Sequence, residues 1–261
     1  MGSSLPVTAN LLLSVMSPED LALLAPDLEK ITLTRRQVLT TPGQQIEHVY
    51  FLEDGVASVV SNSADAVMTE VGVFGREGLS SIAVLLGSDR SPHETFLQLD
   101  GTSAYRIGVD PFRAAIAGSP RLKDLLLRYV QTFLIQVANS VVSNAHSRIE
   151  VRLARWLLMC HDRIDGDEVH LTHEFMSMMV AAQRTGVTLT LHILEGAGII
   201  QSQRARITIV DRDKLEALAG DSYGQPEAEY RRLIGPIGRG QVTGSRRFSI
   251  ENSTNTREER G

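Results

Sequence analysis

The chain has 261 residues, of which 43% are hydrophobic, and its formal net charge is -5 at pH 7. This length suggests one large domain or two ordinary ones with ample material for a packed core, and the acidic balance excludes a generally basic nucleic-acid-binding protein without excluding a local basic face. The single cysteine, Cys160, excludes an intramolecular disulfide and an iron–sulfur or zinc site built from cysteines.

The N-terminal part of the sequence predicts a short helix followed by strands. Ser17 is a suitable N-cap and Pro18 fits the first helical position, with acidic residues next at the positive end of the helix dipole. From about residue 31 to 109, short apolar or alternating segments are separated by turn signals such as Pro42-Gly43 and Asp54-Gly55. Strands at this close spacing are typical of an antiparallel sandwich or barrel.

A long helix is expected from Ser119-Pro120 to about residue 146. Some 25 helical residues extend over about 38 Å, and apolar residues occupy more than one face, so the helix must pack against two partners. We expect these to be the barrel and the same helix of a second copy; the alternative is a helix buried within one molecule. The residues expected at the dimer contact are Leu122, Leu126, Tyr129, Phe133 and Val137.

The segment from 171 to 210 has the order helix, turn, helix, β-hairpin, which predicts a helix-turn-helix followed by a wing. Thr172 is the expected N-cap of the first helix, and we expect a small core between the two helices, formed by Met176, Met179, Val180, Val187, Leu191 and Leu194. The second helix is rich in threonine and glycine, which are poor helix formers, but a compact face without carboxylates suits close approach to a DNA groove. A structural or protein-binding helical hairpin is the alternative. The candidate DNA-contacting residues are Gln183, Arg184, Thr185, Thr188, Leu189, His192, Arg204 and Arg206.

This segment resembles the winged-helix domain of the Crp/Fnr family of bacterial transcription regulators. The matching residues are Leu171, Thr172, Glu174, Arg184, Val187, Thr188, Leu191, Leu194, Gly198 and Ile199. The resemblance implies a homodimer that binds double-stranded DNA at an inverted repeat, with RNA polymerase as a further partner if it activates transcription. It also implies base contacts by Arg184, Thr185 and Leu189, although many members have Glu and Arg at the latter two positions.

The N-terminal half resembles the cyclic-nucleotide-binding jelly roll of the same family. The resemblance implies an effector site at Gly75, Glu77, Arg90 and Ser91, in "FGREGLSSIAVLLGSDRS". Arg76 shifts the first part of this motif, the spacing to Arg90 is about three residues too long, and Pro92 follows. The pattern therefore does not favour a cyclic nucleotide, and the missing cysteine cluster excludes an iron–sulfur sensor.

We therefore expect an α+β protein with four parts: a jelly-roll sensor domain at 10–118, a dimerisation helix at 119–147, a winged helix-turn-helix at 148–220, and a disordered tail at 221–261. No continuous apolar run reaches the roughly 18–20 residues that span a bilayer, so a cytoplasmic location is expected. No catalytic or metal-binding motif is expected, so the chain is not read as an enzyme. The alternative function is a small-molecule-binding regulator that acts on a protein partner without DNA.

Overall fold

The computed structural model describes residues 8–62, 68–98 and 102–239. Two short helices, α1 (Leu11–Ser14) and α2 (Pro18–Leu24), and the 3-10 turn η1 (Ala25–Asp27) precede two antiparallel sheets. The first sheet has the order β1 (Glu29–Leu33), β7 (Thr102–Gly108), β3 (His48–Leu52). The second has the order β2 (Val38–Thr40), β6 (Glu94–Leu97), β4 (Ala57–Asn62), β5 (Met68–Phe74).

The two sheets pack face to face, as the alternating sequence pattern predicts. Leu33 and Leu52 from the first sheet share a buried cluster with Phe74 and Leu97 from the second. Because successive side chains of a strand point to opposite faces, one row from each strand can enter this cluster while the other row covers the outside. The N-terminal region is therefore a β jelly roll, in agreement with the sequence-based expectation.

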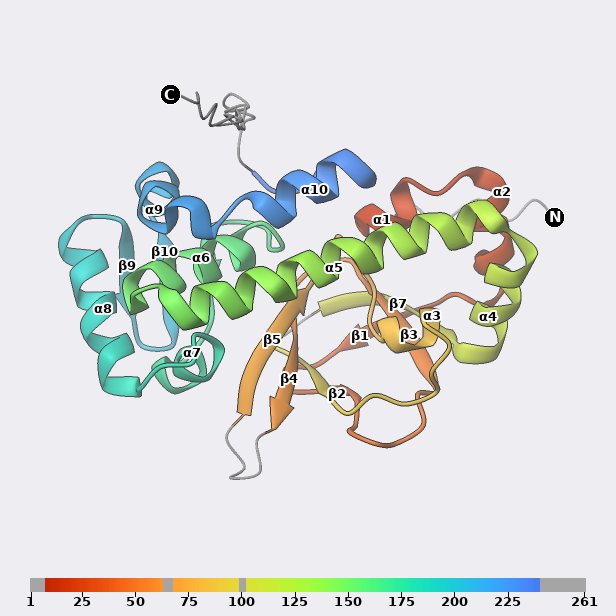
Figure 1. Cartoon of the computed structure of the whole chain (residues 1–261), viewed down its shortest axis with the longest axis horizontal. Helices are drawn as coiled ribbons and strands as arrows, with labels where there is room; N and C mark the ends of the chain where they lie inside the picture. Colours follow the sequence, from red (N-terminus) through yellow and green to blue (C-terminus); the bar gives the residue numbers. More distant parts are fainter. Residues whose placement is uncertain (1–7, 63–67, 99–101, 240–261) are drawn as a thin grey trace, which may run out of the picture.

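Helix α3 (Ile82–Leu85) lies within the jelly roll, between β5 and β6, and two helices, α4 (Val109–Gly118) and α5 (Pro120–His146), connect the jelly roll to the rest of the chain. The α5 helix begins where predicted, because the Ser119 side chain accepts a hydrogen bond from the backbone N–H of Leu122 at 3.2 Å and Pro120 follows. It runs along both the jelly roll and the C-terminal domain (Figure 1). Among the helices of the described residues, only α5 is long and apolar enough to cross a membrane by length and composition. However, much of its apolar surface is packed inside the protein.

The prediction of which residues of α5 contact a second copy is wrong. Leu122, Leu126, Tyr129 and Phe133 are buried within one protomer, and Val137 is partly buried against the jelly roll. Both apolar faces satisfy the same spacing, so the sequence could not tell the inward face from the outward one. The outward apolar face instead carries the exposed side chains of Leu127, Leu134, Val141 and Val142.

The C-terminal domain has the order that the sequence predicts. Its elements are α6 (Ile149–His161), β8 (Glu168–Val169), α7 (His173–Met179), α8 (Arg184–Gly196), β9 (Ile200–Gln203), β10 (Arg206–Ile209) and α9 (Arg212–Ala219), followed by η2 (Gly220–Ser222). Thr172 caps α7 as expected, accepting a hydrogen bond from Phe175 N at 3.2 Å. The predicted small core is confirmed, since it buries Met176, Met179, Val180, Val187, Leu191 and Leu194.

The expectation of a disordered tail from residue 221 is wrong for its first part, while residues 240–261 lie outside the described residues. Helix α10 (Gln225–Leu233) packs along α5 (Figure 1). Its anchor is Tyr230, which is buried and donates a hydrogen bond from Oη to the carbonyl of Glu77 at 2.6 Å. The polar composition of this segment concealed a helix that packs through three buried residues, Pro226, Glu227 and Tyr230.

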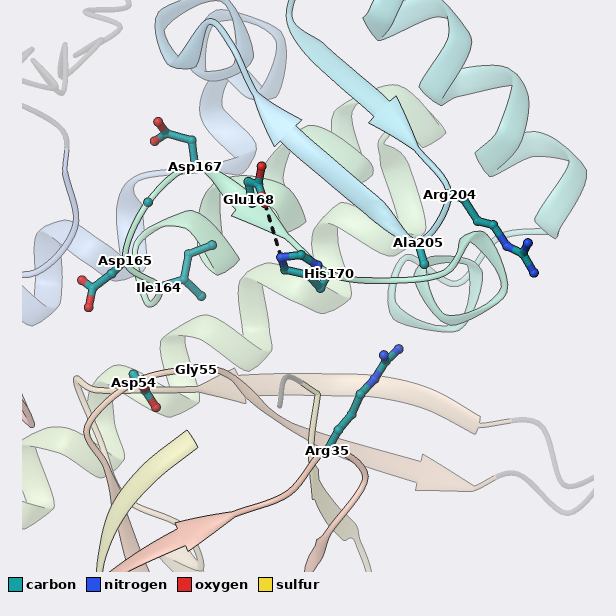
Figure 2. Close-up of a pocket in the computed structure, with 11 residues that line it drawn as sticks. Arg35, Asp54, Gly55, Ile164, Asp165, Asp167, Glu168, His170, Arg204 and Ala205 are labelled. Carbon is teal, nitrogen blue, oxygen red and sulfur yellow. Dashed lines mark ion pairs between the residues drawn. The ribbon is translucent and has the colours of Figure 1, made fainter. Parts of the chain in front are cut away.

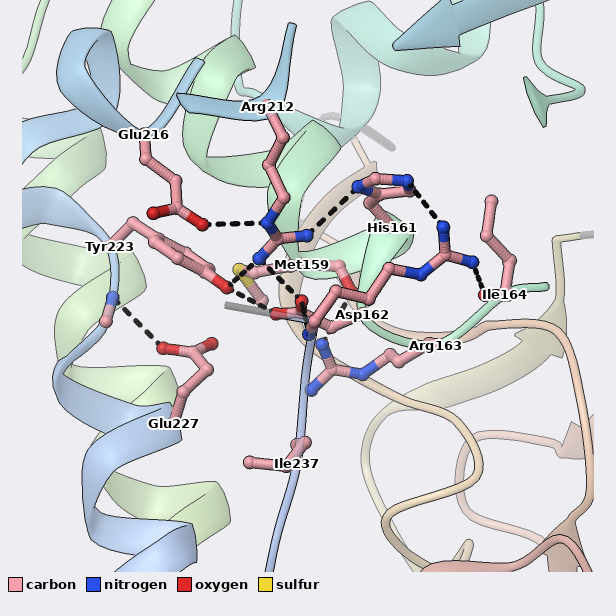
Figure 3. Close-up of polar contacts among 12 residues, drawn as sticks. Met159, His161, Asp162, Arg163, Ile164, Arg212, Glu216, Tyr223, Glu227 and Ile237 are labelled. Atoms are coloured by element: carbon pink, nitrogen blue, oxygen red, sulfur yellow. Dashed lines mark hydrogen bonds and ion pairs between the residues drawn. The ribbon is translucent and has the colours of Figure 1, made fainter. Parts of the chain in front are cut away.

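Residues 225–239, which we name the C-terminal strap, continue past α10 to the far end of α6. Arg239 donates hydrogen bonds to the carbonyl of Ile164 at 2.6 Å and to Oδ1 of Asp167 at 2.9 Å. Beside it, Arg212 and Tyr223 both donate to the carboxylate of Asp162 (Figure 3). The strap thus links α5, the jelly roll and the C-terminal domain within one protomer.

The C-terminal domain also packs directly on the jelly roll. The ring of Phe175 in α7 lies edge-on to Phe96 in β6, with centroids 5.8 Å apart. Next to this pair, Trp156 donates a hydrogen bond from Nε1 to Oε1 of the buried Glu70 at 2.9 Å, and Ser58 donates to the other carboxyl oxygen. Burial raises the pKa of Glu70 to about 8, so this carboxyl is protonated at neutral pH.

Candidate functional site

The outward face of α8 is the first candidate site. Arg184, Thr185, Thr188, Leu189 and His192 line one shallow depression on this helix, as their spacing predicts. No Asp or Glu occurs in α8 before Glu195, and its first turn contains Arg184 rather than an acid. Backbone N–H groups at a helix N-terminus attract anions, so this end of α8 is suited to a phosphate.

The poor helix formers in α8 have local reasons that the structure makes visible. A Cβ atom on Gly186 would lie 3.0 Å from Cδ1 of Ile149, so glycine lets α8 approach α6 closely. Thr188 donates from Oγ1 to the carbonyl of Arg184 at 3.0 Å, and its Oγ1 lies 3.1 Å from Nδ1 of His173. Burial, with the nearby positive charge of Arg184, lowers the pKa of His173. His173, which from the sequence was expected only to lie on the surface, therefore positions a residue of the candidate face.

The turn before α8 contains a strained residue. Ala181 has a φ of 48°, which lies in the left-handed region that favours glycine. The carbonyl oxygens of Val180 and Ala181 accept hydrogen bonds from Arg152 of α6 at 3.0 and 3.1 Å. These contacts fix the turn and thereby the angle between α7 and α8.

The wing places its two arginines in different surroundings. Arg204 is exposed at the turn between β9 and β10, whereas Arg206 is half-buried and forms an ion pair with Glu168 at 3.5 Å. Gln183 is exposed at the N-cap of α8. Arg204 is therefore better placed than Arg206 to offer its charge to a polyanion.

The residues expected at an effector site do not come together. Glu77 is buried in an ion pair with Arg163 at 2.7 Å, and a Cβ atom on Gly75 would lie 2.9 Å from Cβ of Arg163, so this segment packs the jelly roll against the turn that follows α6. Arg90 is exposed and pairs with the neighbouring Asp89 at 3.6 Å. Only Ser91 of the four lines the pocket between the jelly roll and α5. The predicted effector site is therefore wrong. The sequence could not reveal this, because Arg163, which pairs with Glu77, comes from a distant part of the chain.

A second opening of about 790 Å³ lies between the jelly roll and the wing. Arg35 and Asp54 border it from the jelly roll, and Glu168, His170 and Arg204 border it from the C-terminal domain (Figure 2). Charges of both signs line this opening, whereas ligand sites are mostly apolar with a few placed polar groups. We interpret it as a gap between two domains and not as a ligand site.

A model of the Crp-like helix-turn-helix domain matches residues 151–218, which include α6 to α9 almost entirely. Residues 151–218 are a Crp-like helix-turn-helix domain. This Crp-like domain contains α8 and the wing, so every residue of the candidate face lies within it.

Over most of the chain the fold is similar to that of Crp/Fnr regulators. A transcriptional regulator of the Crp/Fnr family from Eubacterium rectale has a TM-score of 0.62 at 15% identity, over 80% of this chain and 97% of its own. A CRP-family regulator from Thermus thermophilus has a TM-score of 0.63 at 19% identity, over 75% and 98%. The c-di-GMP-responsive global regulator CLP from Xanthomonas campestris has a TM-score of 0.60 at 14% identity, over 74% and 99%. Among curated protein sequences, none matches this chain.

Proposed function

We propose that this protein is a sequence-specific DNA-binding regulator of transcription and not an enzyme. The observation that carries the proposal is the exposed face of α8 from Arg184 to His192, which is compact and contains no Asp or Glu of its own. The carboxylate of Glu195 lies 4.0 Å from His192, at the end of this face away from the N-terminus of the helix. Arg184 is long enough to donate two hydrogen bonds to a guanine edge. Arg204 supplies a phosphate contact from the wing. Gln183, Thr185, Thr188, Leu189 and His192 complete the proposed contact, with Arg206 in a secondary role because it is paired with Glu168.

We propose further that the protein acts as a homodimer through α5. Leu127, Leu134 and Val141 are exposed and recur every seven residues, which is the spacing of a coiled-coil seam. A two-fold dimer along α5 would present two α8 helices to successive major grooves about 34 Å apart. The operator is therefore an inverted repeat. A cytoplasmic location and, for an activator, contact with RNA polymerase belong to the same proposal.

One observation favours the second candidate function, a regulator that binds a protein through the same helix. Leu189 is 63% exposed and Ile193 is 49% exposed on α8. An exposed apolar pair suits a protein partner as well as thymine methyl groups. The two functions differ in whether duplex DNA of defined sequence is retained.

The test is selection of bound duplexes from a random library with the purified full-length protein. We expect enrichment of an inverted repeat whose half-sites lie about one helical turn apart. The test variant is Arg184→Ala, which should weaken the enrichment and relax it at one base pair per half-site. The matched control is Arg113→Ala, which removes an exposed arginine of α4 and should retain the full enrichment. If the unmodified protein enriches no sequence, the DNA-binding proposal is wrong and the protein-binding function is favoured.

A further inference from the structure

A pocket of about 360 Å³ lies between the jelly roll and α5; we name it the α5 pocket. Its walls come from all four strands of the second sheet, from α3 and the loop after it, and from residues 133–137 of α5. Its volume lies at the lower end of the range for small-molecule sites, roughly 300–1,000 Å³. A single small molecule would therefore contact both the sheet and the long helix.

The α5 pocket has apolar walls. Val59 and Phe74 line it from the sheet, and Phe133 and Val137 line it from α5. Within the described part of the chain, no Arg, Lys, Asp or Glu lines it. A buried anion without a cationic partner is strongly disfavoured, and the exposed Arg90 does not line this space. The chemistry of the walls therefore fits an uncharged molecule.

One polar atom at the α5 pocket lacks a partner. Nδ1 of His93 is buried, and the described residues provide no hydrogen bond to it. His93 lines the pocket, and its backbone N–H donates a hydrogen bond to Oγ of Ser91 at 3.1 Å. Buried polar atoms are nearly always hydrogen-bonded. A ligand group that donates a hydrogen bond to this nitrogen, or accepts one from it, would supply the missing partner.

The backbone at the same wall is strained. Ser81, which lines the α5 pocket at the start of α3, has a φ of 60° and a ψ of 49°. Non-glycine residues rarely adopt this left-handed conformation, and such positions cluster at ligand sites. Oγ of Ser81 lies 3.1 Å from Oγ1 of Thr40, which places a pair of hydroxyl groups on the wall as well.

We propose that the α5 pocket binds an uncharged, predominantly apolar small molecule that carries one hydrogen-bonding group directed at His93. The inference rests on the proposed function only in making this molecule the effector of the regulator. Ligand binding is measured on the protein without DNA, and operator selection is measured without the ligand, so either proposal can fail while the other holds.

The test is calorimetric titration of the full-length protein at pH 7 with four probes: naphthalene, 1-naphthol, 1-naphthoate and cyclic AMP. We expect the two neutral probes to bind and the two anions to show no binding. 1-Naphthol should bind about threefold to tenfold more tightly than naphthalene, which is the range for one net hydrogen bond. The His93→Phe variant should bind both neutral probes equally, because the partner of the hydroxyl group is removed.

Two further variants locate the site. Ala83→Phe fills the α5 pocket from α3 and should lower the affinity for 1-naphthol more than tenfold. Ala114→Phe makes the same change on an exposed face of α4 and should leave the affinity unchanged. If Ala83→Phe does not fold, the equal affinities of His93→Phe for the two neutral probes decide the question. Binding of the anions, failure of both neutral probes to bind, or undiminished binding by Ala83→Phe would overturn the proposal.

Discussion

Glu70 should make the stability of this protein fall as the pH rises. Burial raises the pKa of this carboxyl from 4.5 to about 8 in the folded protein. In the unfolded chain Glu70 loses its proton near pH 4.5, whereas in the folded protein it keeps the proton to about pH 8. The raised pKa of Glu70 therefore increases the free energy of unfolding. This contribution is fully present below pH 4.5 and is lost as the pH rises towards 8. At about 1.4 kcal/mol per pH unit, the loss over this window is about 5 kcal/mol.

The Glu70→Gln variant should remove this dependence, because its amide has nearly the same shape and stays neutral. The amide oxygen can still accept from Trp156, and Gln98, whose Oε1 is buried without a partner among the described residues, can rotate to accept from the new amide. We expect the variant to match the unmodified protein at pH 5 and to exceed it at pH 8 by as much as about 4 kcal/mol, since three pH units separate the two conditions.

The assay is urea unfolding at pH 5, 6.5 and 8, followed by the fluorescence of Trp156, the single tryptophan. Glu53→Gln is the matched control: although burial opposes the effect, hydrogen bonds from Lys30 and Ser103 lower the pKa of Glu53. That control should not reduce the pH dependence above pH 5. If the stability difference between Glu70→Gln and the unmodified protein is the same at all three pH values, the burial argument is refuted.

Three shorter predictions follow from the packing. Leu127→Glu and Val141→Glu should dissociate the proposed dimer while preserving the protomer fold, since both side chains are exposed; a sedimentation coefficient identical to that of the unmodified protein would contradict this. Ala181→Gly should stabilise the protein by about 0.5–1 kcal/mol, because glycine adopts a φ of 48° without steric cost; lower stability in urea unfolding would refute the strain. Arg239→Ala should lower stability by about 1 kcal/mol through its lost hydrogen bonds and speed hydrogen exchange in α10, and unchanged exchange would show that this arginine does not hold the strap.

Local signals in the sequence predicted local structure well. The caps at Ser17, Ser119 and Thr172 are confirmed, because a short polar side chain and the next three residues determine a helix start. The small core of the winged helix is also confirmed, since helical spacing assigns each apolar residue to a face.

Long-range partners could not be predicted. Glu77 was expected at an effector site, but it pairs with Arg163, which lies 86 residues further along the chain. The inward face of α5 and the position of α10 also depend on surfaces that only the folded jelly roll provides. No periodicity in the sequence distinguishes an apolar face that meets the same molecule from one that meets a second copy.

The central claim, that α8 reads a DNA sequence, is tested most directly with Arg184→Ala. The measurement is the affinity of the unmodified protein, Arg184→Ala and Arg204→Ala for the selected operator and all its single-base variants, at two salt concentrations. We expect Arg184→Ala to cost about 1–3 kcal/mol and to relax the preference at one base pair per half-site. Arg204→Ala should weaken all sequences alike and reduce the salt dependence by about one phosphate contact. A uniform loss of affinity in Arg184→Ala, with every base preference unchanged, would contradict the account.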